Sequence, residues 1–247
     1  MATFDVVIPL GPKDEDIIQR CIESVHKNLT GFRRIYVIAT KKIDLSGCFV
    51  INEDSFPFTR EVVAQKTSED KAGWYLQQLI KFYAPLLISG ALENVLVLDA
   101  DTVFYKRTRF IEGGKYLFDK VVGATSEAYY EHMARLHPSF VPWKKNTSGI
   151  TNMMIFSRPI LIELMGKVEA AHGKDFWEAY LDCIKGGGGA SEYEIYFNYM
   201  MNAKSDSSKI RPLQWNNYGQ RADTRISGDW NYVSYHHQHQ KKPRTFT

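Results

Sequence analysis

Short apolar runs alternate with amphipathic segments through the first half of the chain, and this alternation predicts strands separated by helices. The apolar runs occupy residues 5–10, 35–39, 48–51 and 95–98. Each run is unbroken and bounded by polar or turn-forming residues, which is typical of strands buried on both faces of a parallel sheet. Apolar residues at helical spacing follow Asp14, a candidate N-cap, and continue to Gly31. A second such stretch covers residues 71–88.

The second half of the chain is less regular. Its pattern predicts strands over residues 121–124, 150–156 and 230–235, and helices over residues 159–171, over residues 175–184 and from Ser191 onward. Repeated strand–helix–strand units predict a mostly parallel central sheet with helices on both faces. The 247 residues, of which 44% are hydrophobic, suffice for one large α/β domain with a sizeable core, and we predict a single Rossmann-like domain.

The strongest chemical signal follows the last of the apolar runs. Asp99-Ala100-Asp101 places two carboxylates just past the carboxyl end of a buried strand, which is where open α/β sheets bind ligands. Two neighbouring ionised carboxylates repel each other, and a divalent cation removes that repulsion. Oxygen ligands of this kind suit Mg²⁺ or Mn²⁺, which often bind substrate phosphates as well. The alternative is a solvated turn, because Asp-x-Asp also occurs by chance.

Two enzyme classes place such a pair after such a strand. In haloacid-dehalogenase-like phosphatases, Asp99 would be the nucleophile and Asp101 the general acid. Those enzymes carry the motif on their first strand, whereas at least three predicted strands precede it here, and Asp229 lacks the second acid that their Mg²⁺ site needs. In GT-A glycosyltransferases, the pair follows a nucleotide-binding half, and its metal neutralises charge on the departing nucleoside diphosphate.

The chain resembles GT-A glycosyltransferases at three further stretches. Residues 7–14 resemble the family's first strand and base-binding loop, residues 73–81 the helix that leads to the Asp-x-Asp strand, and residues 236–243 a late metal-binding segment. The likeness is greatest to small viral and bacterial enzymes of this fold, including the capsid-modifying transferases of large algal viruses. It implies a nucleotide-binding half over residues 1–104, followed by an acceptor-binding half with a metal-binding C-terminal segment over residues 105–247.

The late segment has the spacing of glycogenin-like transferases, in which a His completes the metal site and a Lys six positions later contacts the diphosphate. His236 and Lys242-Pro243 have this spacing, although His239 stands where that family has Gly. His237 or His239 could be the ligand instead, and a histidine-containing tail that binds no metal is the alternative. A neutral imidazole favours Mn²⁺ over Mg²⁺.

The resemblance also implies donor-binding roles for residues around the acidic pair. The residues concerned are Pro9, Leu10, Gly11 and Lys13 in the first loop, Gln78 and Lys81 on one helical face, Ala100 between the acids, and Asn152, which resembles a sugar-contacting Asn. Asp99 would contact either the metal or the ribose. For Gln78 and Lys81 the alternative is an ordinary surface position, and for Asn152 it is a buried amide at the end of a strand.

Glu192 is the candidate catalytic residue. Ser191 and Glu194 fit a capping box, which gives Glu194 a structural role, whereas Glu192 in the first turn is free to point into a cleft. The resemblance implies that such an acid is either the general base for the acceptor hydroxyl or a carboxylate that faces the sugar and stabilises an oxocarbenium-like centre. A surface carboxylate favoured by a helix N-terminus is an equal alternative.

Composition narrows the choice of partners and compartment. A net charge of +3 with no dense basic stripe argues against nucleic acid as a partner. The three cysteines, Cys21, Cys48 and Cys183, are far apart, which argues against a disulfide framework or a zinc site. We find neither a signal peptide nor an apolar run of the roughly 20 residues that span a bilayer, so the sequence predicts a cytoplasmic protein without a membrane span. The oligomeric state is not predicted.

We therefore expect a metal-dependent glycosyltransferase that moves a sugar from a nucleotide-sugar donor, with UDP as the expected nucleotide, to a hydroxyl group of a glycan or glycoprotein. Asp99, Asp101 and His236 would hold Mn²⁺ or Mg²⁺, and Lys242 would contact the diphosphate. A Mg²⁺-dependent phosphohydrolase is the second hypothesis, and a non-catalytic nucleotide-sugar-binding module is the third.

Overall fold

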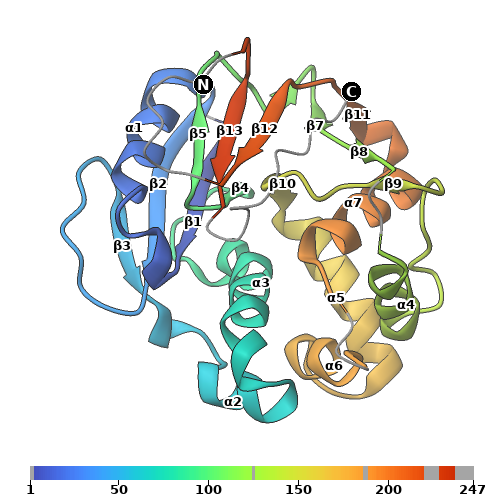
Figure 1. The fold of residues 1–247 in the computed structure, drawn as a ribbon. Coiled ribbons are helices and arrows are strands. Elements are labelled where there is room, and N and C mark those ends of the chain that lie inside the picture. The colour runs from blue at the N-terminus through green and yellow to red at the C-terminus, as the bar shows by residue number, and fades with distance from the viewer. Residues whose placement is uncertain (1–2, 124–125, 186–188, 220–227, 237–247) are drawn as a thin grey trace.

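The main sheet of the protein has five strands in the order β10-β4-β1-β2-β3 (Figure 1). The computed structural model describes residues 3–123, 126–185, 189–219 and 228–236. The strands of this sheet are β1 (Phe4–Leu10), β2 (Phe32–Ala39), β3 (Phe49–Asn52), β4 (Asn94–Leu98) and β10 (Met153–Ser157). β1 pairs in parallel with β2 and β4, and β2 pairs in parallel with β3, whereas β10 is antiparallel to β4. The predicted mostly parallel sheet is therefore confirmed.

Helices cover the sheet (Figure 1), and they lie between its successive strands along the chain except between β2 and β3. They are α1 (Ile18–Asn28), α2 (Arg60–Lys66), α3 (Glu69–Leu87), α4 (Glu127–Leu136), α5 (Arg158–His172), α6 (Phe176–Asp182) and α7 (Glu192–Ala203). α3 packs against β1 and β4, while α5 and α7 pack against β10. Every side chain of β1 is buried, and this two-sided cover explains why the strand is an unbroken apolar run apart from Asp5. Within the described ranges, no helix is both long and apolar enough to cross a bilayer.

Short strands outside the main sheet bring the far end of the chain back to β4. β5 (Thr102–Phe104), β12 (Trp215–Tyr218) and β13 (Tyr232–Tyr235) form one small sheet, in which β13 lies antiparallel to β5. β6 (Ile111–Glu112), β7 (Lys115–Phe118) and β11 (Ser208–Ile210) form another, and β8 (Val121–Val122) pairs with β9 (Thr147–Ser148). Because β5 begins directly after the Asp99-Ala100-Asp101 turn, its pairing with β13 brings His236, the residue after β13, to that turn.

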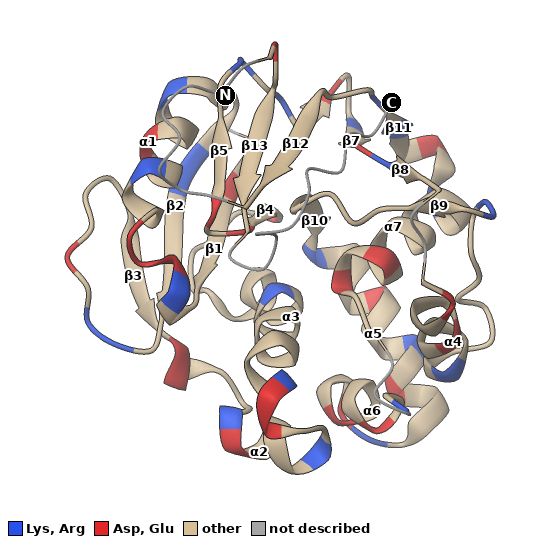
Figure 2. Cartoon of the chain, in the orientation of Figure 1, with Lys and Arg blue, Asp and Glu red and all other residues tan. Residues whose placement is uncertain are grey.

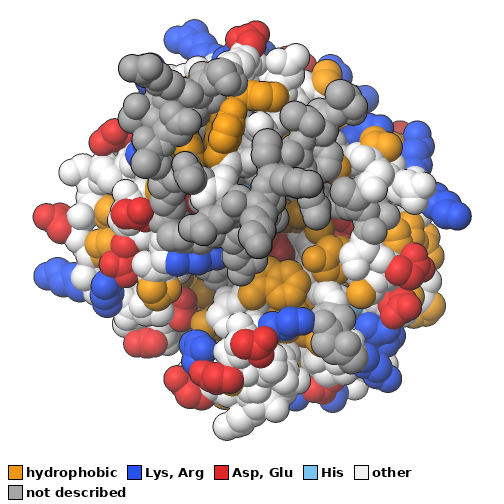
Figure 3. Space-filling view, viewed as in Figure 1, with side chains coloured by type: hydrophobic (Ala, Val, Ile, Leu, Met, Phe, Trp, Pro, Cys, Tyr) orange, Lys and Arg blue, Asp and Glu red, His pale blue; other side chains and the backbone are white. Residues whose placement is uncertain are grey.

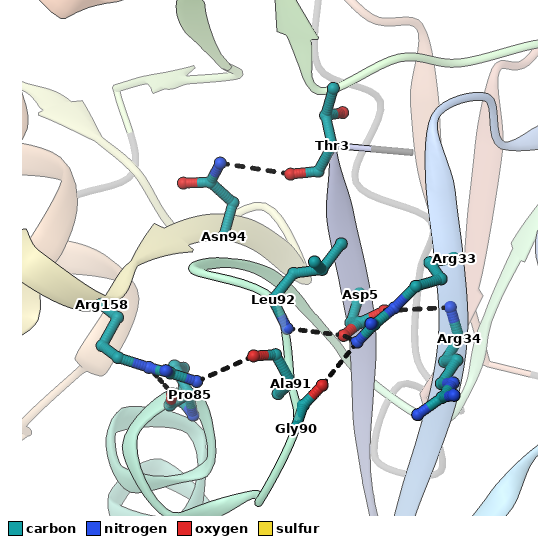
Figure 4. Close-up of polar contacts among 10 residues, drawn as sticks. All are labelled: Thr3, Asp5, Arg33, Arg34, Pro85, Gly90, Ala91, Leu92, Asn94 and Arg158. Carbon is teal, nitrogen blue, oxygen red and sulfur yellow. Dashed lines mark hydrogen bonds and ion pairs between the residues drawn. The ribbon is translucent and has the colours of Figure 1, made fainter. Parts of the chain in front are cut away.

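A buried carboxylate, Asp5, fixes the strands at the end of the sheet away from the acidic turn (Figure 4). The Asp5 side chain is fully buried and accepts hydrogen bonds from both Nε and Nη2 of Arg33, at 3.1 and 2.6 Å. It also accepts the backbone N–H groups of Arg34 and Leu92. Nη2 of Arg33 donates in addition to the carbonyl of Gly90. With charged and backbone donors on both oxygens, the buried charge of Asp5 is fully compensated.

A second arginine closes the same region from the side of α5 (Figure 4). Arg158 donates from Nε to the carbonyl of Pro85 at the end of α3, and from Nη2 to the carbonyl of Ala91. The side chain of Asn94 donates to the carbonyl of Thr3. These contacts fix the start of β4 relative to β1 and α3, so that the other end of β4 delivers its acids at a defined place.

The boundaries of several elements differ from the sequence prediction. The first α-helix begins at Ile18 rather than at Asp14, because Pro12–Asp14 forms a separate 3-10 turn and Ile17 stands at the N-cap position. The strand predicted over 150–156 begins only at Met153, since residues before it turn through Asn152. The strand predicted over 121–124 is reduced to two residues. The helices α2 and α4 were not predicted, because each is short and most of its side chains remain at least partly exposed.

His132 of α4 provides a test of the core by pH. The imidazole is fully buried, contacts the carbonyl of Tyr180 through Nε2 at 2.9 Å, and packs edge-on against that ring. Burial lowers its pKa to about 4 from 6.5. A group whose pKa is lower in the folded state loses its stabilising effect as the pH falls from the unfolded value towards the folded one. We therefore expect the free energy of unfolding to drop by about 3 kcal/mol between about pH 6.5 and pH 4 on account of this group.

The matched variant is His132→Phe, which keeps an aromatic ring but cannot bind a proton. Urea unfolding of both proteins at each pH gives the difference between their free energies of unfolding. That difference should shrink or reverse towards pH 4, because only wild type has an imidazole at this position and its protonation favours the unfolded state. Parallel pH profiles for the two proteins would show that His132 is not the group responsible.

Candidate functional site

The acidic turn lies at the carboxyl end of β4, as the sequence predicted. The backbone carbonyl of Asp99 accepts the N–H of Thr102 at 3.1 Å, which closes the turn, and β5 begins at once. Ala100 is 3% exposed, so it is packed in the turn. The Asp101 side chain is 8% exposed, whereas that of Asp99 is 25% exposed. Both carboxylates therefore sit where parallel sheets bind ligands, and Asp101 is the more deeply buried.

His236 lies directly beside Asp101. The N–H of Tyr235 donates to the carbonyl of Asp101 at 3.0 Å, which continues the pairing of β13 with β5. Nδ1 of His236 is 3.3 Å from Oδ2 of Asp101. Burial disfavours the charged imidazole, but the hydrogen bond to Asp101 and the two nearby carboxylates outweigh it, so the pKa of His236 is raised. The structure thus brings together two of the three predicted metal ligands, which lie far apart in the sequence.

The second oxygen of Asp101 has the properties of an incomplete site. Oδ1 is buried, and no described residue forms a hydrogen bond to it. A buried carboxylate oxygen without a donor is costly unless a ligand satisfies it. Carboxylate oxygens with an imidazole nitrogen are suitable ligands for Mn²⁺ and acceptable ones for Mg²⁺. The chemistry of these donors therefore fits the predicted cation, although the described residues contain no ready-made cluster of three or more metal-binding side chains.

Asp99, the other acid of the turn, forms an ion pair with Lys81 of α3. Nζ of Lys81 is 2.5 Å from Oδ1 of Asp99 and 2.6 Å from Oε1 of Glu192, and its side chain is only 8% exposed. Burial alone would lower the pKa of Lys81, but the two carboxylates outweigh it, and the pKa is raised, so the amine remains charged. Figure 2 shows the acidic residues of α7 in the part of that helix that lies nearest to α3. The alternative of Lys81 as an ordinary surface residue is thus wrong.

Tyr193 belongs to this network, although no sequence pattern had singled it out. Its hydroxyl donates to Oδ1 of Asp99 at 3.0 Å, and its ring lies 4.3 Å from Nζ of Lys81 in a cation–π contact. An aromatic residue in the first turn of a helix carries no recognisable signal, because its contact with Asp99 arises only once α7 has packed against α3 and β4.

Glu192 is buried rather than free to point into an open cleft. Only 3% of the residue is exposed, because α7 packs against α3 and the ion pair with Lys81 turns the carboxylate inward. Glu194 has a structural role, as predicted, but it does not complete a capping box. Oγ of Ser191 accepts the N–H of Glu194, but the Glu194 carboxylate accepts hydrogen bonds from Ser148, Gly149 and Asn198 instead of returning to the start of the helix.

Gln78 is likewise buried and lies one helical turn before Lys81. The residue is 2% exposed, and its Oε1 accepts a short hydrogen bond from the hydroxyl of Tyr180. Its Nε2 is buried, and none of the residues that the structure describes accepts a hydrogen bond from it. The surface alternative is wrong for Gln78 too, whereas its predicted contact with a donor sugar stays a prediction.

Asn152 lies against the acidic turn. Its backbone is left-handed, with φ of 63°, and its carbonyl accepts the N–H of Asp99 at 2.9 Å. The side chain is largely buried and donates to Oδ1 of Asn217 in β12 at 3.3 Å. Asn152 is therefore a buried amide directly before β10, which agrees with the structural alternative given for it. Its predicted contact with a sugar stays a prediction.

The first loop lies beside the same site. Pro9 and Leu10 are buried at the end of β1, while Lys13 is exposed. The positive charge of Lys13 opposes protonation of His236 and so partly offsets the rise in its pKa. A Cβ added at Gly11 would lie 2.9 Å from Nε2 of Gln77 in α3, so the loop passes close to that helix and a larger residue would require the Gln77 side chain to move. Lys242, with the alternative ligands His237 and His239, lies outside the described residues.

The face that contains the site is partly hydrophobic. The space-filling view shows hydrophobic side chains at the surface between α3 and α7 (Figure 3). Trp74, on the first turns of α3, is 41% exposed and packs against Tyr75. Apolar walls with a few converging polar groups are typical of sites for small molecules.

Comparison with solved structures places this geometry on a known fold. The chain is similar to the mannosyltransferase Ktr4p from S. cerevisiae, with a TM-score of 0.55 and 12% sequence identity over 85% of this chain and 68% of that one. It is also similar to mouse xyloside xylosyltransferase 1 in its apo form, with a TM-score of 0.53 and 8% identity over 95% of this chain and 97% of that one. The fold is thus the GT-A fold that the sequence predicted.

Sequence comparison gives the family. No curated protein matches the chain. The likeness to algal-virus capsid-modifying enzymes is accordingly neither supported nor contradicted. A family profile described as "Family of unknown function (DUF6492)" matches residues 4–236, which is nearly the whole chain. The chain therefore belongs to the DUF6492 family and has the GT-A fold.

Proposed function

We propose that this chain is a metal-dependent glycosyltransferase that uses a nucleotide-sugar donor, with a UDP-sugar expected, and a hydroxyl acceptor on a glycan or glycoprotein. The observation that carries the proposal is the meeting of Asp101 and His236 at the carboxyl end of β4. Their contact at 3.3 Å joins the residue before β5 to the residue after β13. Oδ1 of Asp101 remains buried without a partner among the described residues. Both solved structures cited for the fold are named as glycosyltransferases, which supports the same reading.

The chain's own residues would divide the work as follows. Asp101 and His236, with Asp99, would hold Mn²⁺ or Mg²⁺, and a bound cation of this kind would neutralise charge on the diphosphate. Residues 1–104 would bind the nucleotide through the loop after β1, and residues 105–247 would bind the acceptor. Lys242 would contact the diphosphate. Gln78, with a buried Nε2 that lacks a described partner, would donate a hydrogen bond to the donor sugar.

The ion pair with Lys81 favours one of the two roles considered for Glu192. A general base must contact the acceptor hydroxyl directly. Burial raises the pKa of Glu192, but Oε1 is already engaged by the Lys81 amine at 2.6 Å and only 3% of the residue is exposed, so an acceptor hydroxyl has little access to it. A carboxylate that remains ionised in a buried site is instead suited to stabilise positive charge that develops on the sugar. We infer that Glu192 has this electrostatic role.

The rival functions are less well supported. A haloacid-dehalogenase-like phosphohydrolase would use Asp99 as its nucleophile, but Oδ1 of Asp99 is engaged by both Lys81 and Tyr193. The solved structures that share this fold are named as glycosyltransferases, and neither is named as a phosphatase. A non-catalytic binding module would show donor binding without turnover.

The proposal is tested by incubating the purified protein with UDP-, GDP- and CDP-sugars, each with and without Mn²⁺, and measuring release of the nucleoside diphosphate. We expect release from at least one donor in the presence of Mn²⁺ and a loss of that release on chelation. p-Nitrophenyl phosphate serves as the phosphatase control. Hydrolysis of the phosphate ester, or metal-independent binding without turnover of any donor, would contradict the proposal and support one of its rivals.

A further inference from the structure

We propose that Asn152 is a positioning residue that acts through its backbone: its left-handed conformation aims its carbonyl at the N–H of Asp99 and thereby fixes the acidic turn. The residue was expected to use its side chain on a donor sugar. The importance of the turn for a ligand rests on the proposed function, whereas the mechanical link between Asn152 and Asp99 does not.

The backbone geometry carries the first part of the argument. Asn152 and Asn146 are the two residues other than glycine with a positive φ in the described ranges. The carbonyl of Asn152 accepts the N–H of Asp99 at 2.9 Å, and the next residue, Met153, opens β10 opposite Leu98 of β4. The strained residue therefore sits where the β4–β10 ladder ends and the acidic turn begins, and it supplies the last hydrogen bond between the two segments.

The side chain explains why the residue is asparagine. Asparagine adopts the left-handed conformation at lower cost than other residues with a Cβ. Nδ2 donates to Oδ1 of Asn217, and the residue is only 7% exposed, so the amide is engaged within the protein. The hydroxyl of Tyr232 donates to the carbonyl of the preceding residue, Thr151, at 2.9 Å. Both contacts come from the β12–β13 sheet, which also carries His236 to Asp101.

These contacts connect the two halves of the site. The β12–β13 sheet holds Thr151 and Asn152, the Asn152 carbonyl holds Asp99, and the same sheet presents His236 to Asp101. A change in the backbone at Asn152 would therefore alter the separation of Asp99 from Asp101 and His236. Binding geometry of this kind tolerates only small displacements.

Three variants separate the backbone role from a side-chain role. Asn152→Gly removes the amide but keeps access to the left-handed conformation, whereas Asn152→Ala removes the amide and resists that conformation. Asn217→Ala removes the partner of the amide and leaves the backbone of Asn152 unchanged. The first readout is the exchange protection of the Asp99 amide N–H, measured by NMR without any ligand. The second is the affinity for Mn²⁺ in the presence of UDP, measured by calorimetry.

We expect Asn152→Ala to lower the protection of the Asp99 amide about fivefold or more relative to Asn152→Gly, because the left-handed backbone is higher in energy for a residue with a Cβ. Mn²⁺ affinity with UDP should follow the same order, and Asn217→Ala, which removes the same side-chain hydrogen bond as Asn152→Gly, should match Asn152→Gly in both readouts. Equal protection in the Gly and Ala variants would overturn the proposal. Equal loss of donor affinity in both, with the Asp99 amide unaffected, would assign Asn152 a side-chain contact instead. If wild type binds neither Mn²⁺ nor UDP, the proposed function fails, and the amide exchange still decides the role of Asn152.

Discussion

Replacing Lys81 by Met should both destabilise the fold and abolish turnover. The change leaves Asp99 and Glu192 facing each other in a nearly buried site without the amine that contacts both. Breaking a buried ion pair by removing one partner costs about 3–5 kcal/mol, because the remaining charge is left uncompensated. We expect a loss of that order in the free energy of unfolding, measured by urea titration, and a fall in donor turnover of at least about a hundredfold, because two misplaced carboxylates disrupt the electrostatics of the site.

A surface ion pair of the same length provides the matched control. Lys66 contacts Asp182 at 2.6 Å, but both side chains are considerably more exposed than that of Lys81. Lys66→Met should therefore cost less than about 1 kcal/mol and leave turnover intact. The double variant Lys81→Met/Glu192→Gln should recover part of the stability without turnover, since it removes a buried charge along with its partner. Full stability in Lys81→Met alone would contradict the buried network described here.

Asp101→Asn should show the opposite pattern, with metal-dependent binding lost and stability kept. Oδ1 of Asp101 is buried without a described hydrogen-bond donor, and Oδ2 has only the long 3.3 Å contact with His236, so the folded state gains little from the negative charge. Removing that charge should leave the free energy of unfolding unchanged or raise it, as is common for residues kept for function. Mn²⁺-dependent binding of UDP should fall by about a hundredfold or more, because even the loss of groups that merely support metal ligands costs 10–100-fold. Calorimetry and urea unfolding measure the two effects.

Asp5→Asn is the control for Asp101→Asn, because Asp5 is also a buried carboxylate but has donors on both oxygens. That variant should lose stability, since Arg33 would be left without its ionised partner, and its folded fraction should bind Mn²⁺ and UDP as wild type does. If Asp101→Asn instead behaves as Asp5→Asn does, then Asp101 is a structural residue and the proposed site is wrong.

The sequence predicted β1, β2 and β4 because each contains a continuous apolar run that a doubly covered sheet buries. β3 was predicted from a similar run, although it is an edge strand and most of its residues are exposed. The same reasoning predicted the position of the acidic turn, since the residues after such a strand must leave the core at its carboxyl end. The resemblance to GT-A transferases predicted that Asp101 and His236 lie close together. Periodicity could not have done so, because that contact depends on the pairing of β5 with β13.

The polar interior of the site could not be predicted in the same way. Lys81 was predicted to contact the donor or to lie on the surface, and Glu192 to face a cleft or to lie on the surface. Neither prediction included their ion pair, because only the packing of α3 against α7 brings the two side chains together. Tyr193 and the backbone role of Asn152 also depend on tertiary contacts that have no sequence pattern. The first turn of the first helix was misplaced because Asp14 looks like a cap, although Pro12–Asp14 forms a separate turn.

The most direct test of the central claim is the position of a cation in the folded protein. Crystals grown with Mn²⁺ and UDP can be measured at the manganese absorption edge, and the anomalous difference map locates the ion independently of any assumption about the protein. We predict a peak within bonding distance of a carboxylate oxygen of Asp101 and a ring nitrogen of His236, in contact with the diphosphate. A map in which UDP is bound and Asp101 has no manganese beside it would contradict the account.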